Sequence, residues 1–192
     1  FKNTTIPKKY KGSAIAIGNF DGVHKGHQKI FNQAKMYTKR NKLKFGVLTF
    51  TPLPVMFFNK KIKNHRLVSE NQKLDFIKEY GTDFVVNIKF NKIFSKITAE
   101  NFIKKIIFKK IKPQLIFVSN NFKFGNKRKG NVSLLRSYCN KYNYRLINIK
   151  PFKYKGRIVS STRIRESLQS GNLDLANTLL SRTWSIKGTV QK

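Results

Sequence analysis

The chain has 192 residues, of which 40% are apolar and 13% aromatic, and its formal net charge is +33 at pH 7. This length and apolar content predict a folded chain of one domain, or one domain and part of a second, and exclude a disordered basic tail. The excess charge is mostly lysine spread from Lys2 to Lys192, which is typical of a compositional bias and favours anionic ligands without selecting one.

Short apolar runs alternate with longer amphipathic stretches along the chain. The runs at residues 13–20, 43–50, 83–90, 113–119 and 144–152 predict strands, and the stretches at 26–40, 71–80, 99–111 and 131–142 predict helices between them. Strands that alternate with helices favour βαβ units and a parallel sheet, so we expect an α/β fold. In such sheets ligands bind beyond the carboxyl ends of the strands.

The stretch GNFDGVHKGH, residues 18–27, lies where the first predicted strand meets the first predicted helix. Its glycines permit a tight turn, and the free N–H groups and positive dipole end of a helix start favour phosphate. His24 and His27 are three residues apart, so both can face one ligand. A neutral His donates one hydrogen bond and a protonated His two, which suits phosphate oxygens. The alternative is a glycine-rich turn with two exposed histidines.

A second stretch, SSTRIR, also predicts the start of a helix. Ser160, Ser161 and Thr162 directly precede a helical pattern that carries Arg163 and Arg165. Hydroxyls in this position are typical of an N-cap, and the stretch alone fits an ordinary capped helix. Together with the histidine stretch, however, it predicts two helix N-termini that can hold a triphosphate between them.

The number of cysteines and the hydropathy of the chain indicate where in the cell the protein is expected. A single Cys139 excludes an intramolecular disulfide and a cysteine-based zinc site, and it fits a reducing cytoplasm. No run of about 18 apolar residues could cross a bilayer. We therefore expect a cytoplasmic protein with no membrane partner.

Four stretches together resemble the FMN adenylyltransferase module of the prokaryotic bifunctional riboflavin kinase/FAD synthetase family. They are AIGNFDGVHKGHQ, LTFTPLP with FF close behind it, FVSNNFKFGNKRKGN and VSSTRIRESLQSGNLDLANTLLSRTWSIKG. The resemblance covers nearly the whole chain in the family's order and spacing. It implies a Rossmann-like nucleotidylyltransferase fold and the transfer of AMP from ATP to FMN, which gives FAD and pyrophosphate. ATP and FMN would be the substrates, and Mg²⁺ would arrive mainly on the ATP phosphates, with no protein ligand assigned to it.

The resemblance also implies roles for individual residues. The residues matching the catalytic phosphate contacts are His24, His27 and Arg165. Those matching the ATP and phosphate-binding positions are Gly18, Phe20, Asp21, Gly26, Ser161 and Thr162. Those matching the flavin and metal-phosphate region are Asn121, Phe122, Phe124, Phe57 and Phe58, of which the last two equally fit plain core packing.

The sequence departs from the family pattern in three ways. Leu53 stands where the family commonly has His, and Ser119 stands where it commonly has Gly. The third departure concerns the domains, because residues 1–180 match the adenylyltransferase and residues 181–192 resemble only the first strand of a riboflavin kinase module. A kinase barrel would need on the order of 100 further residues, so we expect no riboflavin kinase activity from this chain.

Two other functions remain open. Another HxGH transferase, acting on a pantetheine, nicotinamide or glycerol phosphate, would share the ATP half, although the FKFG stretch at 122–125 argues against it. A non-catalytic module that binds nucleic acid would explain the charge, but the set of motifs favours an enzyme over such a module. His65 could contact a phosphate but is interpreted as a solvated loop residue, and the basic stretch 126–131 is interpreted as a mobile basic loop near the nucleotide or simply a solvated loop. The oligomeric state is left open.

Overall fold

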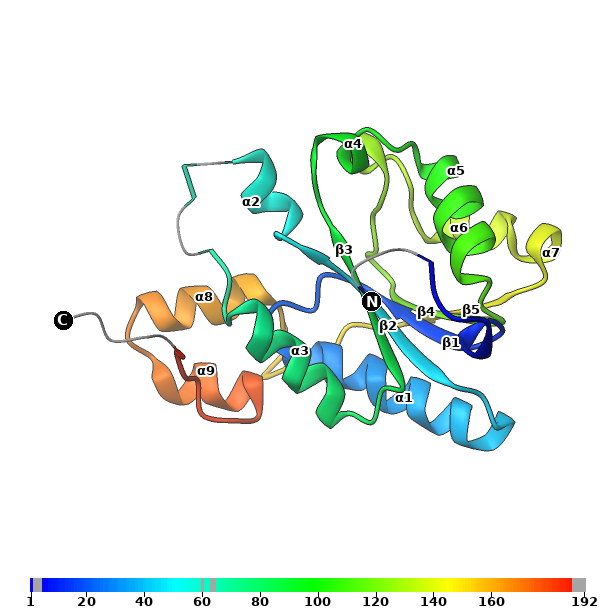
Figure 1. Ribbon diagram of the computed structural model, residues 1–192. Coiled ribbons are helices and arrows are strands. Elements are labelled where there is room, and N and C mark those ends of the chain that lie inside the picture. The colour runs from blue at the N-terminus through cyan, green and yellow to red at the C-terminus, as the bar shows by residue number, and fades with distance from the viewer. Residues whose placement is uncertain (2–4, 60, 63–64, 188–192) are drawn as a thin grey trace.

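The computed structural model describes residues 1, 5–59, 61–62 and 65–187. At its centre is a five-stranded sheet in the order β3-β2-β1-β4-β5, in which all neighbouring strands are parallel (Figure 1). The strands are β1 (Ala14–Ile17), β2 (Phe45–Thr51), β3 (Phe84–Lys89), β4 (Leu115–Ser119) and β5 (Arg145–Ile149). Each lies within a predicted strand except that β2 extends one residue further, to Thr51, so the predicted α/β fold with a parallel sheet is confirmed.

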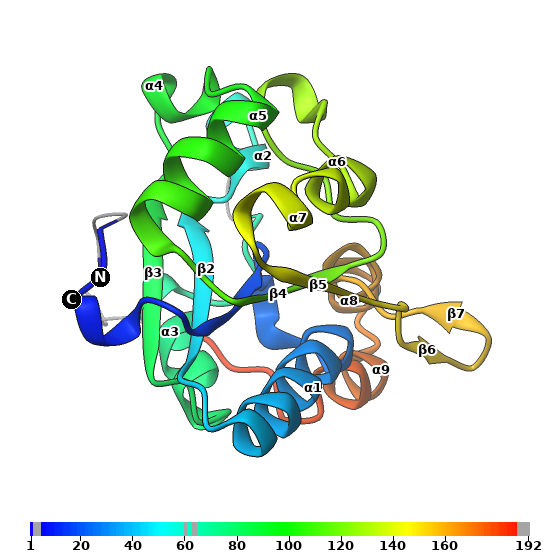
Figure 2. The same ribbon diagram turned by 90° about the vertical axis from the view of Figure 1, so that its right-hand side faces the viewer.

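Helices cover both faces of the sheet (Figures 1 and 2). On one face lie α1 (Lys25–Asn41) and α3 (Glu70–Glu79), and on the other lie α5 (Ala99–Asn101), the π-helix η3 (Phe102–Ile111), α6 (Val132–Ser137) and α7 (Cys139–Tyr142). The short helices α2 (Pro54–Phe58) and α4 (Lys92–Ser95) follow the carboxyl ends of β2 and β3. Three 3-10 turns are η1 (Lys8–Tyr10), η2 (Asp21–Val23) and η4 (Asn126–Arg128).

The C-terminal part of the chain adds a hairpin and two helices. The hairpin of β6 (Lys153–Tyr154) and β7 (Arg157–Ile158) projects from the body in Figure 2, and α8 (Ser161–Gln169) and α9 (Leu173–Leu180) follow it. A smaller apolar cluster that includes Leu67, Ile164 and Leu180 packs these helices against the rest. Residues 182–187, expected to begin a strand, form no regular element, and the remainder of that expected strand, 188–192, lies outside the described residues.

Alternating side chains of β1 divide the main core into two halves. Ile15 and Ile17 pack in the cluster that contains η3, whereas Ala14 and Ala16 pack in the cluster that contains Phe31 of α1. All four side chains are buried, as a parallel sheet covered on both faces requires. Each face of β1 therefore packs against one of the two helical layers.

The strand order reverses at β1, which pairs with β2 on one side and with β4 on the other. The helices that follow β1 and precede β4 lie on opposite faces of the sheet. Ligands of such sheets bind at the carboxyl ends of the strands beside this reversal. The connections that leave β1 and β4 are therefore the places to look for a site. Within the described ranges, no helix combines the length and apolar content that a membrane span needs.

Candidate functional site

The connection after β1 is a tight turn that ends at the N-terminus of α1. Gly22 and Val23 have φ angles of 76° and 41°. His24 is the N-cap of α1, and its Nδ1 accepts a hydrogen bond from the backbone N–H of Gly26 at 3.1 Å. A Cβ atom on Gly26 would lie 3.0 Å from the His24 ring and 3.3 Å from the Val159 carbonyl oxygen. A side chain at position 26 would therefore crowd the His24 ring and the Val159 carbonyl.

The two histidines lie face to face at the start of α1. The ring centroids of His24 and His27 are 3.6 Å apart, with 21° between the ring planes. Burial, with a smaller effect from Arg182, lowers the pKa of His24 to about 3, and burial also lowers the pKa of His27 well below its usual value. Both rings are therefore neutral near pH 7. Because Nδ1 of His24 accepts a hydrogen bond, the proton of this neutral ring is assigned to Nε2, which is a donor.

Phe20 and Gly18 act on the site through His27. Phe20 is fully buried and packs edge-on against the His27 ring, with the two centroids 5.2 Å apart. A Cβ atom on Gly18 would lie 3.0 Å from the Phe20 ring, so the glycine makes room for this ring. The Nδ1 atom of His27 is buried and has no hydrogen-bond partner in the described part of the chain. The predicted ATP-binding residues Phe20 and Gly18 thus lie on the side of the His27 ring that faces the core, and their role in ATP binding stays a prediction.

The SSTRIR stretch begins α8 directly beside this turn, with Ser160 as the N-cap. The Ser161 hydroxyl donates a hydrogen bond to the Asp21 carbonyl at 3.0 Å. Arg165 forms a salt bridge with Asp21, 2.9 Å from Nη1 to Oδ2, and also donates to the carbonyl of His65 at 3.2 Å. The structure thus brings together the two helix N-termini that the sequence marked separately.

Asp21 joins the two helix starts. Its buried carboxylate accepts a hydrogen bond from the backbone N–H of Leu67 at 2.9 Å in addition to the salt bridge with Arg165. Burial raises the pKa of Asp21, and the Leu67 N–H and the Arg165 charge oppose that rise. Among the described residues, the only hydrogen-bond partner of the Nη2 atom of Arg165 is the hydroxyl of the exposed Thr162, at a long 3.5 Å. This nitrogen therefore keeps donor capacity for a ligand.

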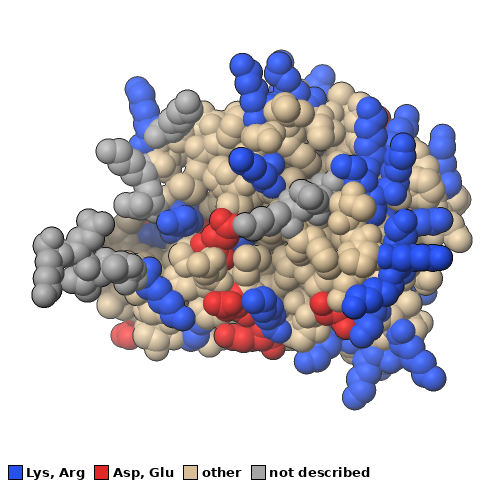
Figure 3. Space-filling model, viewed as in Figure 1, with Lys and Arg blue, Asp and Glu red and all other residues tan. Residues whose placement is uncertain are grey.

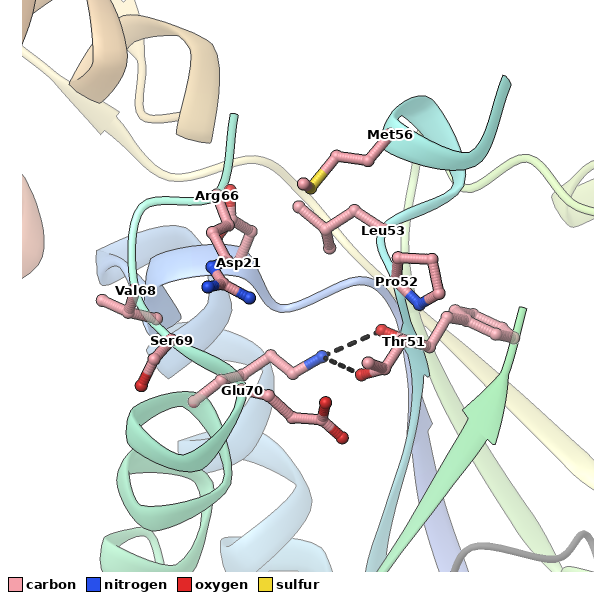
Figure 4. Close-up of a pocket in the computed structure, with 11 residues that line it drawn as sticks. Asp21, Thr51, Pro52, Leu53, Met56, Arg66, Val68, Ser69 and Glu70 are labelled. Carbon is pink, nitrogen blue, oxygen red and sulfur yellow. Dashed lines mark hydrogen bonds between the residues drawn. The ribbon is translucent and has the colours of Figure 1, made fainter. Parts of the chain in front are cut away.

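A cavity of about 70 Å³ adjoins Asp21 between the β2–α2 connection and the start of α3 (Figure 4). Asp21, Leu53 and Glu70 are among the side chains that line it, together with Lys73. The buried Lys73 ammonium donates hydrogen bonds to the Phe50 carbonyl at 2.9 Å and to the hydroxyls of Thr49 and Thr51 at 3.3 and 3.4 Å. Burial lowers the pKa of Lys73 to about 8.

Sequence reasoning missed Lys73, although one signal pointed to it. Lys73 lies four residues before the buried Ile77, so it lies on the buried face of α3 rather than on the face where lysine is expected.

The chain matches a model of a known protein family. The model described as FAD synthetase matches residues 6–163 of the chain. The chain belongs to the FAD synthetase family. It is 30% identical over 190 residues to an FAD synthetase of Listeria monocytogenes, covering 98% of this chain and 76% of that protein.

Two further relatives extend the comparison. A bifunctional riboflavin kinase/FMN adenylyltransferase of Buchnera aphidicola subsp. Schizaphis graminum is 40% identical over 186 residues, which cover 96% of this chain and 60% of that protein. The chain thus spans 60% of the length of this relative. A crystal structure described as a macrolide-efflux protein from Streptococcus pneumoniae has a TM-score of 0.82 at 25% identity, covering 95% of this chain and 59% of that one. The predicted Rossmann-like fold is consistent with this likeness.

In this member of the FAD synthetase family, a row of aromatic rings joins the two segments predicted to form the flavin region. Phe57 and Phe58 at the end of α2 pack against Phe90, with centroids 5.4 and 5.8 Å apart. The row continues through Phe94, Phe102 and Phe124 to Phe122, with neighbouring centroids 5.4 to 6.2 Å apart. The Phe58 side chain is 68% exposed at one end, whereas Phe124 is buried. Phe124 therefore supports the row from within the core.

Asn121 lies in the loop after β4 and is exposed. The loop turns back at once, because the backbone N–H of Phe122 donates to the Ser119 carbonyl at 3.0 Å. No hydrogen bond between described residues joins Asn121 to the histidine turn. The basic residues that follow, 127–129, are exposed, as expected of a solvated loop. In the described ranges, no three His, Cys, Asp or Glu side chains gather closely enough to hold a metal ion.

Proposed function

We propose that this chain transfers the adenylyl group of ATP to FMN, giving FAD and pyrophosphate. The observation that carries the proposal is the junction at Asp21, where the histidine-bearing start of α1 and the arginine-bearing start of α8 meet in a chain of the FAD synthetase family. Helix N-termini with neutral imidazoles and a guanidinium are donors that suit a polyphosphate. The names of the relatives favour a flavin phosphate over pantetheine, nicotinamide or glycerol phosphates.

The reaction makes limited chemical demands on the protein. A phosphate oxygen of FMN forms a bond to the α-phosphorus of ATP, the bond from that phosphorus to the bridging oxygen breaks, and pyrophosphate leaves. The second pKa of a phosphate monoester is about 6, so the FMN phosphate is largely dianionic near neutral pH and needs no general base. The site must instead hold two anions in line and stabilise the charge that develops on the leaving group.

The residues of the turn match these demands. The Nε2–H of His24 and the backbone N–H of Lys25, the first residue of α1, are proposed to donate to the ATP phosphates, with the ring of His27 stacked against that of His24. The Nη2 atom of Arg165 is proposed to donate from the opposite helix start. An approaching phosphate favours the protonated imidazole, so both low pKa values are expected to rise when ATP binds. Mg²⁺ is proposed to enter as part of the ATP substrate.

The remaining residue roles and the location belong to the same proposal. Ser161 and Thr162 are proposed to face the phosphates from α8, and Asn121 to face the flavin end of the site from the loop after β4. The exposed Phe58 is proposed to offer its ring to the flavin. A single, half-buried Cys139 supports a cytoplasmic location.

The basic charge comes from Lys and Arg residues along the whole chain, and we do not propose that it binds nucleic acid. On the face that Figure 3 shows, Lys and Arg side chains are most numerous along the right and top edges, and the acidic side chains lie in the centre and the lower half. Recognition of nucleic acid is typically associated with basic residues gathered in one patch or stripe. The scattered lysines fit the compositional bias that the sequence suggests.

The direct test is incubation of the protein with FMN, ATP and Mg²⁺, followed by separation of the flavins and assay of pyrophosphate. We expect FAD and pyrophosphate in equal amounts from FMN and no product from riboflavin. Phosphopantetheine, nicotinamide mononucleotide and glycerol phosphate should release no pyrophosphate. Folded protein that binds ATP but forms no FAD would overturn the flavin assignment. Leu53→His and Ser119→Gly would then show whether these two departures from the family are responsible.

A further inference from the structure

The five residues after α9, Ser181 to Ser185, pack against the start of α1 and the histidine turn, and we call this segment the strap (Figure 1, red). The hydrogen bonds of the strap reach three separate elements. They run from the Ser181 hydroxyl to Gln28 Oε1 at 2.8 Å, from Arg182 Nη2 to the Gly22 carbonyl at 2.5 Å, from Trp184 Nε1 to the Leu67 carbonyl at 2.8 Å and from Gln72 Nε2 to the Ser185 carbonyl at 3.1 Å.

The turn that the strap contacts has an unfavourable backbone. Gly22 and Val23, the two residues before His24, both have positive φ angles, and 41° is a strained value for a β-branched residue such as Val23. Such conformations persist only where surrounding contacts hold them. The carbonyl of Val23 accepts hydrogen bonds from Gln28 Nε2 at 2.8 Å and from Arg182 Nη1 at 3.5 Å.

Arg182 is suited to hold these carbonyls. Its guanidinium lies 3.8 Å from the centroid of the Phe76 ring, and burial lowers its pKa. No salt bridge within the described residues involves Arg182. Its donors go instead to backbone carbonyls, of Gly22, Val23 and Leu180. A fixed planar fork of donors is a feature of arginine that lysine cannot reproduce.

Trp184 provides a second anchor to the same turn. Its indole N–H donates to the carbonyl of Leu67, and the backbone N–H of Leu67 donates to the Asp21 carboxylate. Arg182 therefore contacts η2, the segment directly before His24, and Trp184 is connected to η2 through Leu67. The strap also returns to α9, because the backbone N–H of Trp184 donates to the Asn177 side chain at 2.8 Å.

We infer that Arg182 is a positioning residue that fixes the turn before His24, and through it the stacked pair of His24 and His27. The effect of Arg182 on catalysis rests on the proposed adenylyl transfer. The effect of Arg182 on the positions of the two histidine rings does not depend on that proposal. Without the guanidinium the carbonyls of Gly22 and Val23 lose their strap contacts and the turn can relax. The N-cap His24 would then move relative to the bound phosphates.

The first measurement reads the rings without any substrate. The chain has three histidines, so labelling of histidine side chains gives three sets of NMR signals, and Trp184, the single tryptophan, reports docking of the strap by its fluorescence. In Arg182→Ala we expect the ring signals of His24 and His27 to shift while those of His65 stay near their wild-type positions. Arg182→Lys, which keeps the charge but loses the planar fork, should give intermediate shifts.

The second measurement reads the consequence for catalysis. A misplaced contact can cost up to about 100-fold in rate, so we expect kcat of Arg182→Ala to fall about tenfold or more, with the KM for FMN nearly unchanged. Arg182→Lys should recover part of the loss. If wild-type protein forms no FAD, the proposed function fails, and the ring signals still test the strap.

Two matched controls separate positioning from lost stability. Arg40→Ala removes an exposed arginine at the far end of α1, and Leu168→Ala removes part of the apolar cluster beneath the strap without touching the turn. Ring signals that stay at wild-type positions in Arg182→Ala, or that shift as much in Leu168→Ala, would overturn the inference. If Arg182→Ala does not fold, the same comparison is made with Arg182→Lys.

Discussion

The histidine turn and the aromatic row are held in place in different ways. The turn depends on directional bonds, since Asp21, Ser161 and Arg165 are joined by hydrogen bonds and a salt bridge at 2.9 to 3.0 Å. The row depends on ring packing, with centroids 5.3 to 6.2 Å apart between Phe57 and Phe122. The histidine turn therefore has little freedom to adjust, whereas the aromatic row ends in the exposed ring of Phe58.

The difference indicates how each region responds to substitution. Hydrogen-bond geometry is lost when an atom moves by a few tenths of an ångström, whereas apolar packing tolerates rearrangement at moderate cost. Substitutions in the turn should therefore act on the rate of the reaction. Substitutions at the exposed end of the row should act on flavin affinity alone.

The largest effect is expected for His27→Ala. Loss of a positioned group beside developing charge typically costs about 10²-fold or more in kcat, and removal of this ring also takes away the packing partner of His24. The measurement is FAD formation at saturating ATP. His65→Ala is the matched control, because Arg165 contacts the backbone carbonyl of His65, which the variant keeps. Equal turnover in wild type and His27→Ala would show that the histidine turn does not contribute to the rate of the reaction.

Lys73 gives a prediction about stability against pH. Its pKa is lowered from 10.5 to about 8 in the folded protein, so between these values the unfolded chain binds more protons and stability rises with pH. Relative to Lys73→Met, the free energy of unfolding of the wild type should therefore increase by up to about 3 kcal/mol from pH 8 to pH 10.5. Denaturant unfolding of both proteins across this range measures the difference. A constant difference would mean that the ammonium is not held in a desolvated site.

The sequence was informative where the signal is local. The apolar run at 13–20 predicted a strand buried on both faces, and β1 is such a strand. The spacing of His24 and His27 predicted that the two side chains lie on the same side of the helix start, and their rings stack, whereas a shared ligand stays a prediction. Ser160, in the hydroxyl run, is the N-cap of α8. Each of these predictions rests on residues a few positions apart, where helix and strand periodicity apply.

Sequence was uninformative where the signal is distant. Arg182 contacts Gly22, which lies 160 positions earlier in the chain. In a chain with 41 Lys and Arg residues, nothing in the sequence distinguishes Arg182 from the other basic residues. The burial of Phe20 against the His27 ring depends on the fold and could not be predicted from the motif in which Phe20 lies. The hairpin of β6 and β7 was missed because each strand has two residues. The division after residue 180 stays a prediction.

Asp21→Asn tests the junction of the two helices with a smaller expected effect. Asparagine keeps an oxygen for the Leu67 N–H but cannot pair with the charge of Arg165, so the guanidinium is freed from the turn. We expect kcat/KM for ATP to fall about tenfold. The control is Asp75→Asn on α3, whose pairing with Lys78 at 3.5 Å is exposed. Unchanged kinetics with ATP would show that the salt bridge serves stability alone.

Phe58→Ala tests the exposed end of the aromatic row and should have the smallest effect. Because 68% of the side chain is already exposed, its removal costs little stability, and a kinetic change can be attributed to the ligand. Aromatic pairs contribute about 0.5–1.5 kcal/mol, so we expect the KM for FMN to rise by about two- to tenfold with kcat unchanged. Ile93→Ala on α4 is the matched control, because Ile93 is 80% exposed and is not part of the row. A rise in the KM for FMN in both variants would point to a general effect of this edge of the molecule. A rise confined to Phe58→Ala would show that the Phe58 ring contributes to flavin affinity, separately from the contacts of the histidine turn that set the rate.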